Sequence, residues 1–203
     1  MRSKTIFIIA FIVIIALAAS VAFIATEQSN HVEIILNTNG TDVKVQASSI
    51  LLFNRVPDTM LMEMKDKALI DVESDTSTVD SVKDDMKSIA ESYNYNATIK
   101  IDSQFGTDQL PMPATVSGTS MVPTLKDGQN IILVKTKSFK VGDIVVARHP
   151  SYGLIVKRVS QINGGQVYLM SDNRETIVTS NGVLKGLDTW LPIDNVVGVV
   201  KQY

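Results

Sequence analysis

The sequence predicts a β-rich domain that follows one membrane-spanning helix and a small α/β module. The first observation is an uncharged apolar run at residues 6–25. The second is a polar, mixed region at residues 27–110, in which strand-like alternation is followed by a helical repeat. The third is a series of short β-branched runs punctuated by glycine at residues 111–203, which is typical of an all-β domain. We therefore divide the chain into 1–26, 27–110 and 111–203.

Composition excludes several classes of function. The chain has 203 residues and a formal net charge of −2, so it lacks the basic surface that a nucleic-acid partner would require. It contains no cysteine, which excludes disulfides and thiolate chemistry. Its two histidines, His31 and His149, are far apart and have no acidic residue at a zinc-motif spacing. We expect neither a metal nor an organic cofactor.

The apolar run at residues 6–25 has the length of a transmembrane helix, since about 20 apolar residues span a bilayer. The alternative is a cleaved secretory signal, which the small residues at Ala18–Ala22 would allow. Length favours a retained anchor. Arg2 and Lys4 precede the run and Glu27 follows it, so the N-terminus is expected in the cytoplasm and the rest of the chain outside the cell membrane.

Alternation, turn signals and helical spacing predict the elements of the other two regions. In the α/β module, whose role the sequence does not indicate, we expect a hairpin at 31–37 and 42–47, a helix at 79–93 capped by Ser77, and a strand at 97–102. After a break at Pro111-Met112-Pro113, we expect strands at 131–135, 143–148, 154–162, 166–170 and 196–200.

A candidate nucleophile lies at Ser120, within a stretch rich in hydroxyl groups. A serine hydroxyl needs a neighbouring base. His149 lies in a predicted turn and is expected at the surface. Lys157 shares a strand face with Ile155 and Val159, and desolvation on an apolar face lowers the pKa of a lysine and makes it a possible general base. The alternative is that Lys157 extends its ammonium to water at a strand edge.

Five segments resemble, in order, the conserved boxes of signal peptidase I. They are SGTSMVPTL at 117–125, GDIVVAR at 142–148, VKRV at 156–159, SDNR at 171–174 and LPIDNVVGVV at 191–200. The resemblance implies the signal peptidase β fold and a membrane-bound serine endopeptidase without a cofactor. Its partners would be the bilayer and exported preproteins, from which it would cut signal peptides.

The resemblance also implies roles for single residues. Ser120 would attack the scissile carbonyl, and Lys157 would take its proton and return it to the leaving amine. The backbone N–H of Ser120 would help to hold the oxyanion, and Gly118 would allow a close approach. Thr119, Met121 and Pro123 would support the wall and turn beside the nucleophile, although core packing explains Met121 and Pro123 equally well.

The fourth box departs from the family, because Ser171 replaces its glycine and no clear serine-containing tail follows. Thr176 is the first candidate for the hydroxyl that orients Lys157, ahead of Ser180 and Thr179. Asp172, Asn173 and Arg174 are expected to be structural, with Asp172 and Arg174 paired to each other or to neighbours of the dyad.

Two rival interpretations remain. The short spacing between Ser120 and Lys157 also resembles the LexA and UmuD type of self-cleaving peptidases, which cut at an Ala-Gly or Cys-Gly bond that this chain lacks. The altered fourth box would suit an anchored surface protein whose peptidase domain has degenerated and whose α/β module binds a partner. The two intact catalytic boxes favour an active peptidase.

Overall fold

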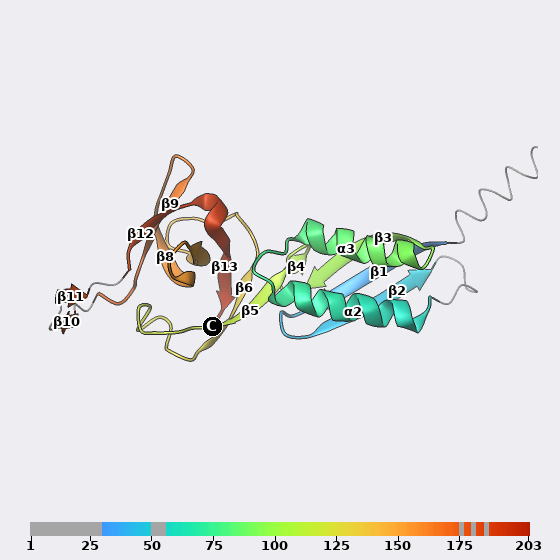
Figure 1. The fold of residues 1–203 in the computed structure, drawn as a ribbon, viewed down its shortest axis with the longest axis horizontal. Coiled ribbons are helices and arrows are strands. Elements are labelled where there is room, and N and C mark those ends of the chain that lie inside the picture. The colour runs from blue at the N-terminus through green and yellow to red at the C-terminus, as the bar shows by residue number, and fades with distance from the viewer. Residues whose placement is uncertain (1–29, 50–55, 175–176, 180–181, 185–186) are drawn as a thin grey trace, which may run out of the picture.

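The computed structural model describes residues 30–49, 56–174, 177–179, 182–184 and 187–203. The apolar run at 6–25, for which a membrane anchor is predicted, lies outside these ranges. Among the described residues, no helix is both long and apolar enough to cross a bilayer. The described residues form two units that lie end to end, an α/β module and a β domain (Figure 1).

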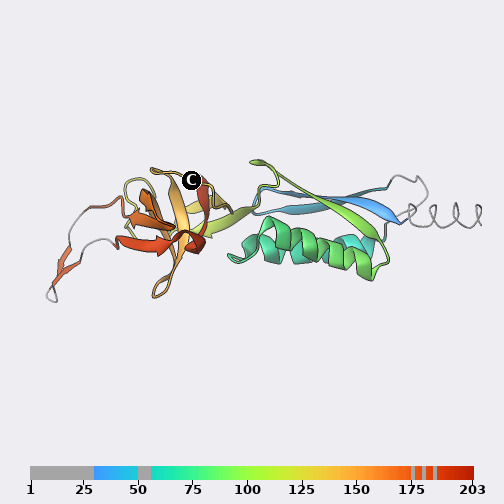
Figure 2. The same cartoon turned by 90° about the horizontal axis from the view of Figure 1, so that it is seen from above.

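The α/β module is a four-stranded sheet with two helices on one of its faces (Figure 2). The strands lie in the order β2-β1-β3-β4, with β1 antiparallel to β2 and parallel to β3. A parallel pair needs a long crossover, which the two helices supply. The elements are β1 (His31–Thr38), β2 (Val43–Ser49), α2 (Asp58–Glu73), α3 (Val79–Ser92), β3 (Asn96–Ser103) and β4 (Gly106–Thr107).

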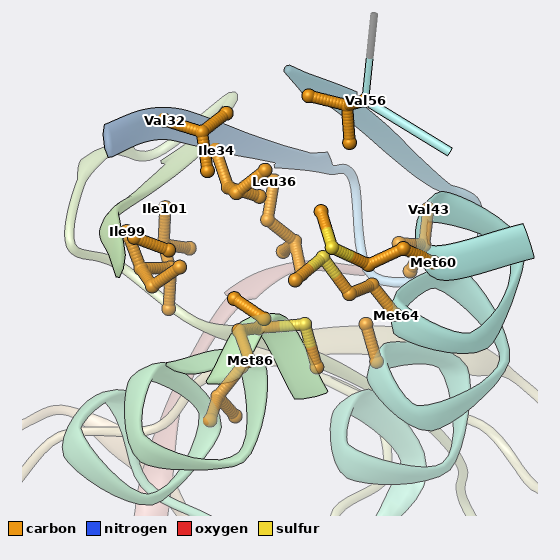
Figure 3. Packing of buried hydrophobic residues seen from close by; sticks show 14 of the residues in the cluster. Val32, Ile34, Leu36, Val43, Val56, Met60, Met64, Met86, Ile99 and Ile101 are labelled. Atoms are coloured by element: carbon orange, nitrogen blue, oxygen red, sulfur yellow. The ribbon is translucent and has the colours of Figure 1, made fainter. Parts of the chain in front are cut away.

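The core of the module lies between the sheet and the helices (Figure 3). Alternate residues of β1 are buried, which directs Ile34 and Leu36 toward the helices. Met60 and Met64 from α2 and Met86 from α3 meet them, and all three are fully buried. Flexible methionine side chains fill the irregular space between a twisted sheet and two helices.

Helix α3 agrees with the helix predicted at 79–93, but helix α2 and the cap of α3 differ from the sequence predictions. Helix α2 has no predicted counterpart, because its N-cap residue, Pro57, offers no side-chain acceptor that would mark a helix start. The prediction that Ser77 caps α3 is wrong. Thr78 is the N-cap: its Oγ1 accepts from Ser81 N–H at 3.1 Å, and Ser81 Oγ accepts from Thr78 N–H at 2.8 Å. This reciprocal capping box fixes the start of α3.

The β domain is built on a seven-stranded sheet in the order β12-β9-β8-β7-β13-β6-β5 (Figure 1). Its neighbouring strands are all antiparallel. The mainly β fold predicted from the sequence is therefore confirmed. The elements are β5 (Pro111–Thr115), β6 (Asn130–Val134), β7 (Ile144–His149), β8 (Gly153–Asn163), β9 (Gln166–Met170), β12 (Thr189–Pro192), the 3-10 turn η1 (Ile193–Asn195) and β13 (Val196–Gln202), with a separate hairpin of β10 (Ile177–Thr179) and β11 (Gly182–Leu184).

The segment Pro111-Met112-Pro113 is a strand, so its interpretation as a break is wrong. Pro111 and Pro113 pair with Val134 and Ile132 of β6. Proline is tolerated in this strand because β5 stands at the edge of the sheet, where a missing N–H breaks no ladder on the outer side. The edge strand β5 leads directly into the segment that carries Ser120.

Two cations of the β domain hold the end of helix α2. The ammonium of Lys135 donates to the carbonyl oxygens of Asp71 and Ser74 at 2.7 and 2.6 Å, and to Ser77 Oγ at 2.7 Å. Arg148 pairs with Asp75 at 2.5 Å. The last turn of α2 has no basic residue of its own, so these cations satisfy its exposed carbonyls and oppose its dipole. Burial lowers the pKa of Lys135 to about 8.

Candidate active site

The loop that carries Ser120, which we call the nucleophile loop, spans residues 116–129 between β5 and β6. Its two ends are joined by reciprocal backbone bonds of 2.9 Å, from Val116 N–H to Gln129 and from Gly128 N–H to Val116. Gly118 has φ +88°, a conformation that glycine adopts at little cost, and its N–H donates to Asp127 Oδ1 at 2.8 Å. These bonds shape the loop before any substrate arrives.

The residues around Ser120 divide between core and surface. Met121 and Leu125 are fully buried in an apolar cluster of the β domain and anchor the loop. Thr119 and Pro123 are exposed. A Cβ on Gly118 would have no described atom within 4 Å, so its backbone conformation, and not a crowded contact inside the chain, accounts for the glycine.

The structure brings Ser120 and Lys157 together. Lys157 lies on β8 opposite Val145 of β7, and its Nζ donates to Ser120 Oγ at 2.5 Å. Only 4 % of Lys157 is exposed, whereas Ser120 is half-buried. Burial lowers the pKa of Lys157 below that of an ordinary lysine. A lysine that loses its proton this readily can accept one from the serine hydroxyl to which it is bonded.

Asp188, immediately before β12, is a site residue that the sequence predictions missed. Its carboxylate accepts from the backbone N–H of Ser171 at 2.9 Å and from Arg174 at 2.6 Å. It is also the strongest of the charges that oppose the lowering of the pKa of Lys157. Arg174 thus pairs with Asp188, a neighbour of the dyad, rather than with Asp172. No motif around Asp188 marks it, because its role depends on a tertiary contact.

The predicted lysine-orienting hydroxyls lie outside the described structure. This holds for all of Thr176 and Ser180, and for the side chain of Thr179. Their roles stay predictions.

Asp172 connects the fourth box to the lysine strand and to the nucleophile loop. It accepts from Arg158 Nε and Nη2 at 2.7 and 2.6 Å, and from Thr124 Oγ1 at 2.6 Å. Its hydrogen bonds with Arg158 hold the pKa of Asp172 below its usual range and raise that of Arg158. The paired donors of the guanidinium give this contact a fixed geometry. Because Arg158 follows Lys157 in β8, the pair fixes the strand that carries the lysine.

Asn173 binds two backbone carbonyl groups of the nucleophile loop. Its N–H donates to the carbonyl oxygen of Ser120 at 2.9 Å, and its Nδ2 donates to that of Thr119 at 3.1 Å. The peptide units before and after Ser120 are therefore both oriented. In the described part of the chain, the N–H of Ser120 itself donates to no acceptor, so it remains available for an oxyanion.

A groove of about 690 Å³ leads to the dyad. One wall is β5, the other is the first half of β8, and Ser120 and Lys157 both line it. Apart from Lys157, those lining residues that the structure describes carry no charge. The apolar members include Met112, Ala114, Ile131, Val146, Leu154 and Val156. Elsewhere in the described ranges, no three histidine, aspartate or glutamate side chains are placed to hold a metal ion.

An antiparallel β domain that sets a serine against a buried lysine, at the end of an apolar groove, is the arrangement of a serine peptidase with a lysine base. The family model described as Peptidase S24-like matches residues 78–181, more than half of the chain. The chain belongs to the Peptidase S24-like family, and the serine peptidase class expected from the sequence follows from that membership. The matched region includes Ser120, Lys157 and the fourth box. Among the curated proteins, none matches the chain.

Proposed function

We propose that this protein is a membrane-bound endopeptidase of the signal peptidase I type, which cuts signal peptides from exported precursors. The observation that carries the proposal is the hydrogen bond of 2.5 Å between Lys157 Nζ and Ser120 Oγ, made by a lysine that is only 4 % exposed. An exposed lysine would stay protonated at neutral pH and could not serve as a base.

The geometry supports a two-step mechanism. Neutral Lys157 takes the proton of the Ser120 hydroxyl as Oγ attacks the scissile carbonyl, and the resulting oxyanion is held by the N–H of Ser120. The protonated lysine then gives its proton to the leaving amine, which departs and leaves an ester on Ser120. Water, activated by the same lysine, hydrolyses the ester and regenerates both side chains.

The groove suits an extended, uncharged peptide segment. The strand β5 has a free edge, and β9 pairs with β8 only from Arg158 onward. Among the described strands, the backbone of residues 153–157 therefore has a partner on one side only, in β7. A substrate strand can add to such free edges by backbone hydrogen bonds, while the apolar walls select its side chains. The cleavage region of a signal peptide has this uncharged character.

The placement at a membrane rests on the sequence. The apolar run at residues 6–25, with Arg2 and Lys4 before it, would confine the enzyme and its precursors to the outer face of one membrane. Confinement raises the effective concentration of the substrate.

Self-cleavage of the LexA and UmuD type is the second candidate, favoured by the short spacing of the dyad. The absence of Ala-Gly and Cys-Gly from the sequence speaks against it. A degenerate domain is less well supported, because the altered fourth box still places Asn173 against Ser120.

The test is incubation of the purified full chain in detergent with a model preprotein. We expect the wild type to make a single cut after the signal peptide. The cleavage rate should fall by at least about a thousandfold in Ser120→Ala. It should be unchanged in Ser138→Ala, which alters an exposed serine of the same domain. Cleavage that persists in Ser120→Ala would exclude the dyad. Shortening of the enzyme itself, at a rate independent of its concentration, would instead support self-cleavage.

A further inference from the structure

The groove has a second feature at the end opposite the dyad. Tyr152, in the turn between β7 and β8, lines the groove and is 65 % exposed. Lys157 lies five positions further along the chain, which corresponds to about 16 Å of extended chain. Leu154, between them, also lines the groove and is 44 % exposed. Large apolar side chains are thus presented to solvent along the approach to the dyad.

The two walls of the groove have a common direction. Because β5, β6, β13, β7 and β8 follow one another in antiparallel pairs, β5 and β8 run the same way. Strand β5 leads toward Ser120 and β8 toward Lys157. A peptide extended between them, with its scissile bond at Ser120, would place a side chain beside Tyr152 about five residues from that bond. This spacing holds for either direction of the peptide.

The exposed ring of Tyr152 packs against a neighbouring ring. Its ring lies 4.8 Å from the ring of His149, at an angle of 45°. The Nδ1 of His149 accepts from the N–H of Ser151 at 3.1 Å, which orients the imidazole. An aromatic side chain held in this way offers a large contact area at a low cost in conformational entropy.

We infer that Tyr152 is a specificity-determining residue, which contacts an apolar side chain of the substrate about five residues from the scissile bond. His149 is its positioning residue. The inference rests on the proposed peptidase function, but it concerns binding and can be measured without cleavage. An apolar occupant follows from the lining of the groove, because Lys157 is the one charged side chain among its described residues and lies away from Tyr152.

The test uses the full chain carrying Ser120→Ala, so that peptides bind without being cut. The ligands are pairs of synthetic peptides that contain the cut sequence of the model preprotein. The two peptides of a pair differ at one position, which holds leucine in one and aspartate in the other. The varied positions lie about four to six residues before or after the scissile bond. Their dissociation constants are measured by fluorescence anisotropy. At one of these positions, we expect leucine to bind about tenfold more tightly than aspartate.

When Tyr152→Ala is combined with Ser120→Ala, the preference for leucine should disappear and the affinity for the aspartate peptide should be unchanged. Tyr152→Phe in the same background should keep the preference for leucine. Trp190→Ala is the matched control, because Trp190 is 42 % exposed, lies 5.1 Å from the ring of Tyr168 and is not among the residues that line the groove. The inference is overturned if Tyr152→Ala keeps the preference for leucine, or if it weakens the binding of both peptides equally. If the Ser120→Ala protein prefers the leucine peptide but the wild type cleaves no preprotein, this inference stands and the proposed function is refuted.

Discussion

The backbone N–H of Asn173 donates to the carbonyl oxygen of Ser120 at 2.9 Å. The two residues are far apart in the sequence, so the fourth box directly holds the peptide unit that follows the nucleophile. This contact does not depend on the side chain at position 171, where serine stands in place of the glycine in the signal peptidase I box that the segment resembles. The departure from the box therefore leaves the support of the nucleophile intact.

Asn173→Ala should reduce kcat/KM about tenfold, because it removes the hydrogen bond of 3.1 Å from Nδ2 to the carbonyl of Thr119. The backbone bond to Ser120 remains, so the thermal midpoint should change little. Steady-state cleavage and thermal unfolding of the same preparation measure the two effects. Asn163→Ala, at an exposed position in β8, is the control. An unchanged kcat/KM in Asn173→Ala would show that the side chain does not position the loop.

The cleavage rate should rise with pH as Lys157 loses its proton. Because burial lowers the pKa of Lys157, the midpoint should lie below 10.5, the ordinary value for lysine. Lys157→Met should lose about 10²–10⁴-fold in kcat, the usual contribution of a general base. Lys140→Met, at an exposed lysine, should keep both the rate and the profile. A profile with an ordinary lysine midpoint would contradict the role of Lys157 as a base that works near neutral pH.

Asp188→Asn should move the same midpoint to lower pH. The carboxylate of Asp188 raises the pKa of Lys157, so its neutralisation lets that pKa fall further. The pH dependence of kcat/KM, measured at two salt concentrations, tests this assignment. A purely structural role would reduce the rate at every pH without moving the midpoint.

Asp172→Asn should destabilise the β domain by about 1–2 kcal/mol at neutral pH, since it weakens charge-assisted bonds with the partly exposed Arg158. The folded-state pKa of Asp172 is depressed, so its contribution is present above the ordinary value of 3.8 and is lost as pH falls through the lower, folded value. Urea unfolding at several pH values should show wild type and variant converging in acid. If the difference in the free energy of unfolding between wild type and variant stays the same at every pH, the charge of Asp172 is not the source of the stabilisation.

The sequence predicts the dyad of this site better than the residues around it. Ser120 and Lys157 lie in short motifs, and strand alternation alone assigns Lys157 to an apolar face. Asp188 and the contact of Asn173 with Ser120 arise from chain folding, which leaves no local pattern. Helix α2 has no local signal for a related reason, since its N-terminus has no capping side chain and its burial is decided by packing against β2 and α3.

The junction between the two units gives a prediction for alkaline pH. Burial lowers the pKa of Lys135 to about 8, whereas in the unfolded chain it titrates near 10.5. Between these values the unfolded state binds more protons, so the free energy of unfolding should rise with pH. In urea titrations of the full chain, wild type should gain stability relative to Lys135→Met from pH 8 to pH 10.5, by less than the roughly 3 kcal/mol that the full shift would give, because solvent screens the partly exposed ammonium.

Comparison with a variant is needed because other lysines and tyrosines titrate in the same window. Lys140→Met, at an exposed lysine, should follow the wild type throughout. Below pH 8, Lys135→Met should still loosen the junction, since the carbonyls of Asp71 and Ser74 lose their donor. Faster proteolysis of the segment between α2 and α3 would report that loosening. If the free energies of unfolding of wild type and Lys135→Met change with pH in parallel, the ammonium of Lys135 is not desolvated at the junction.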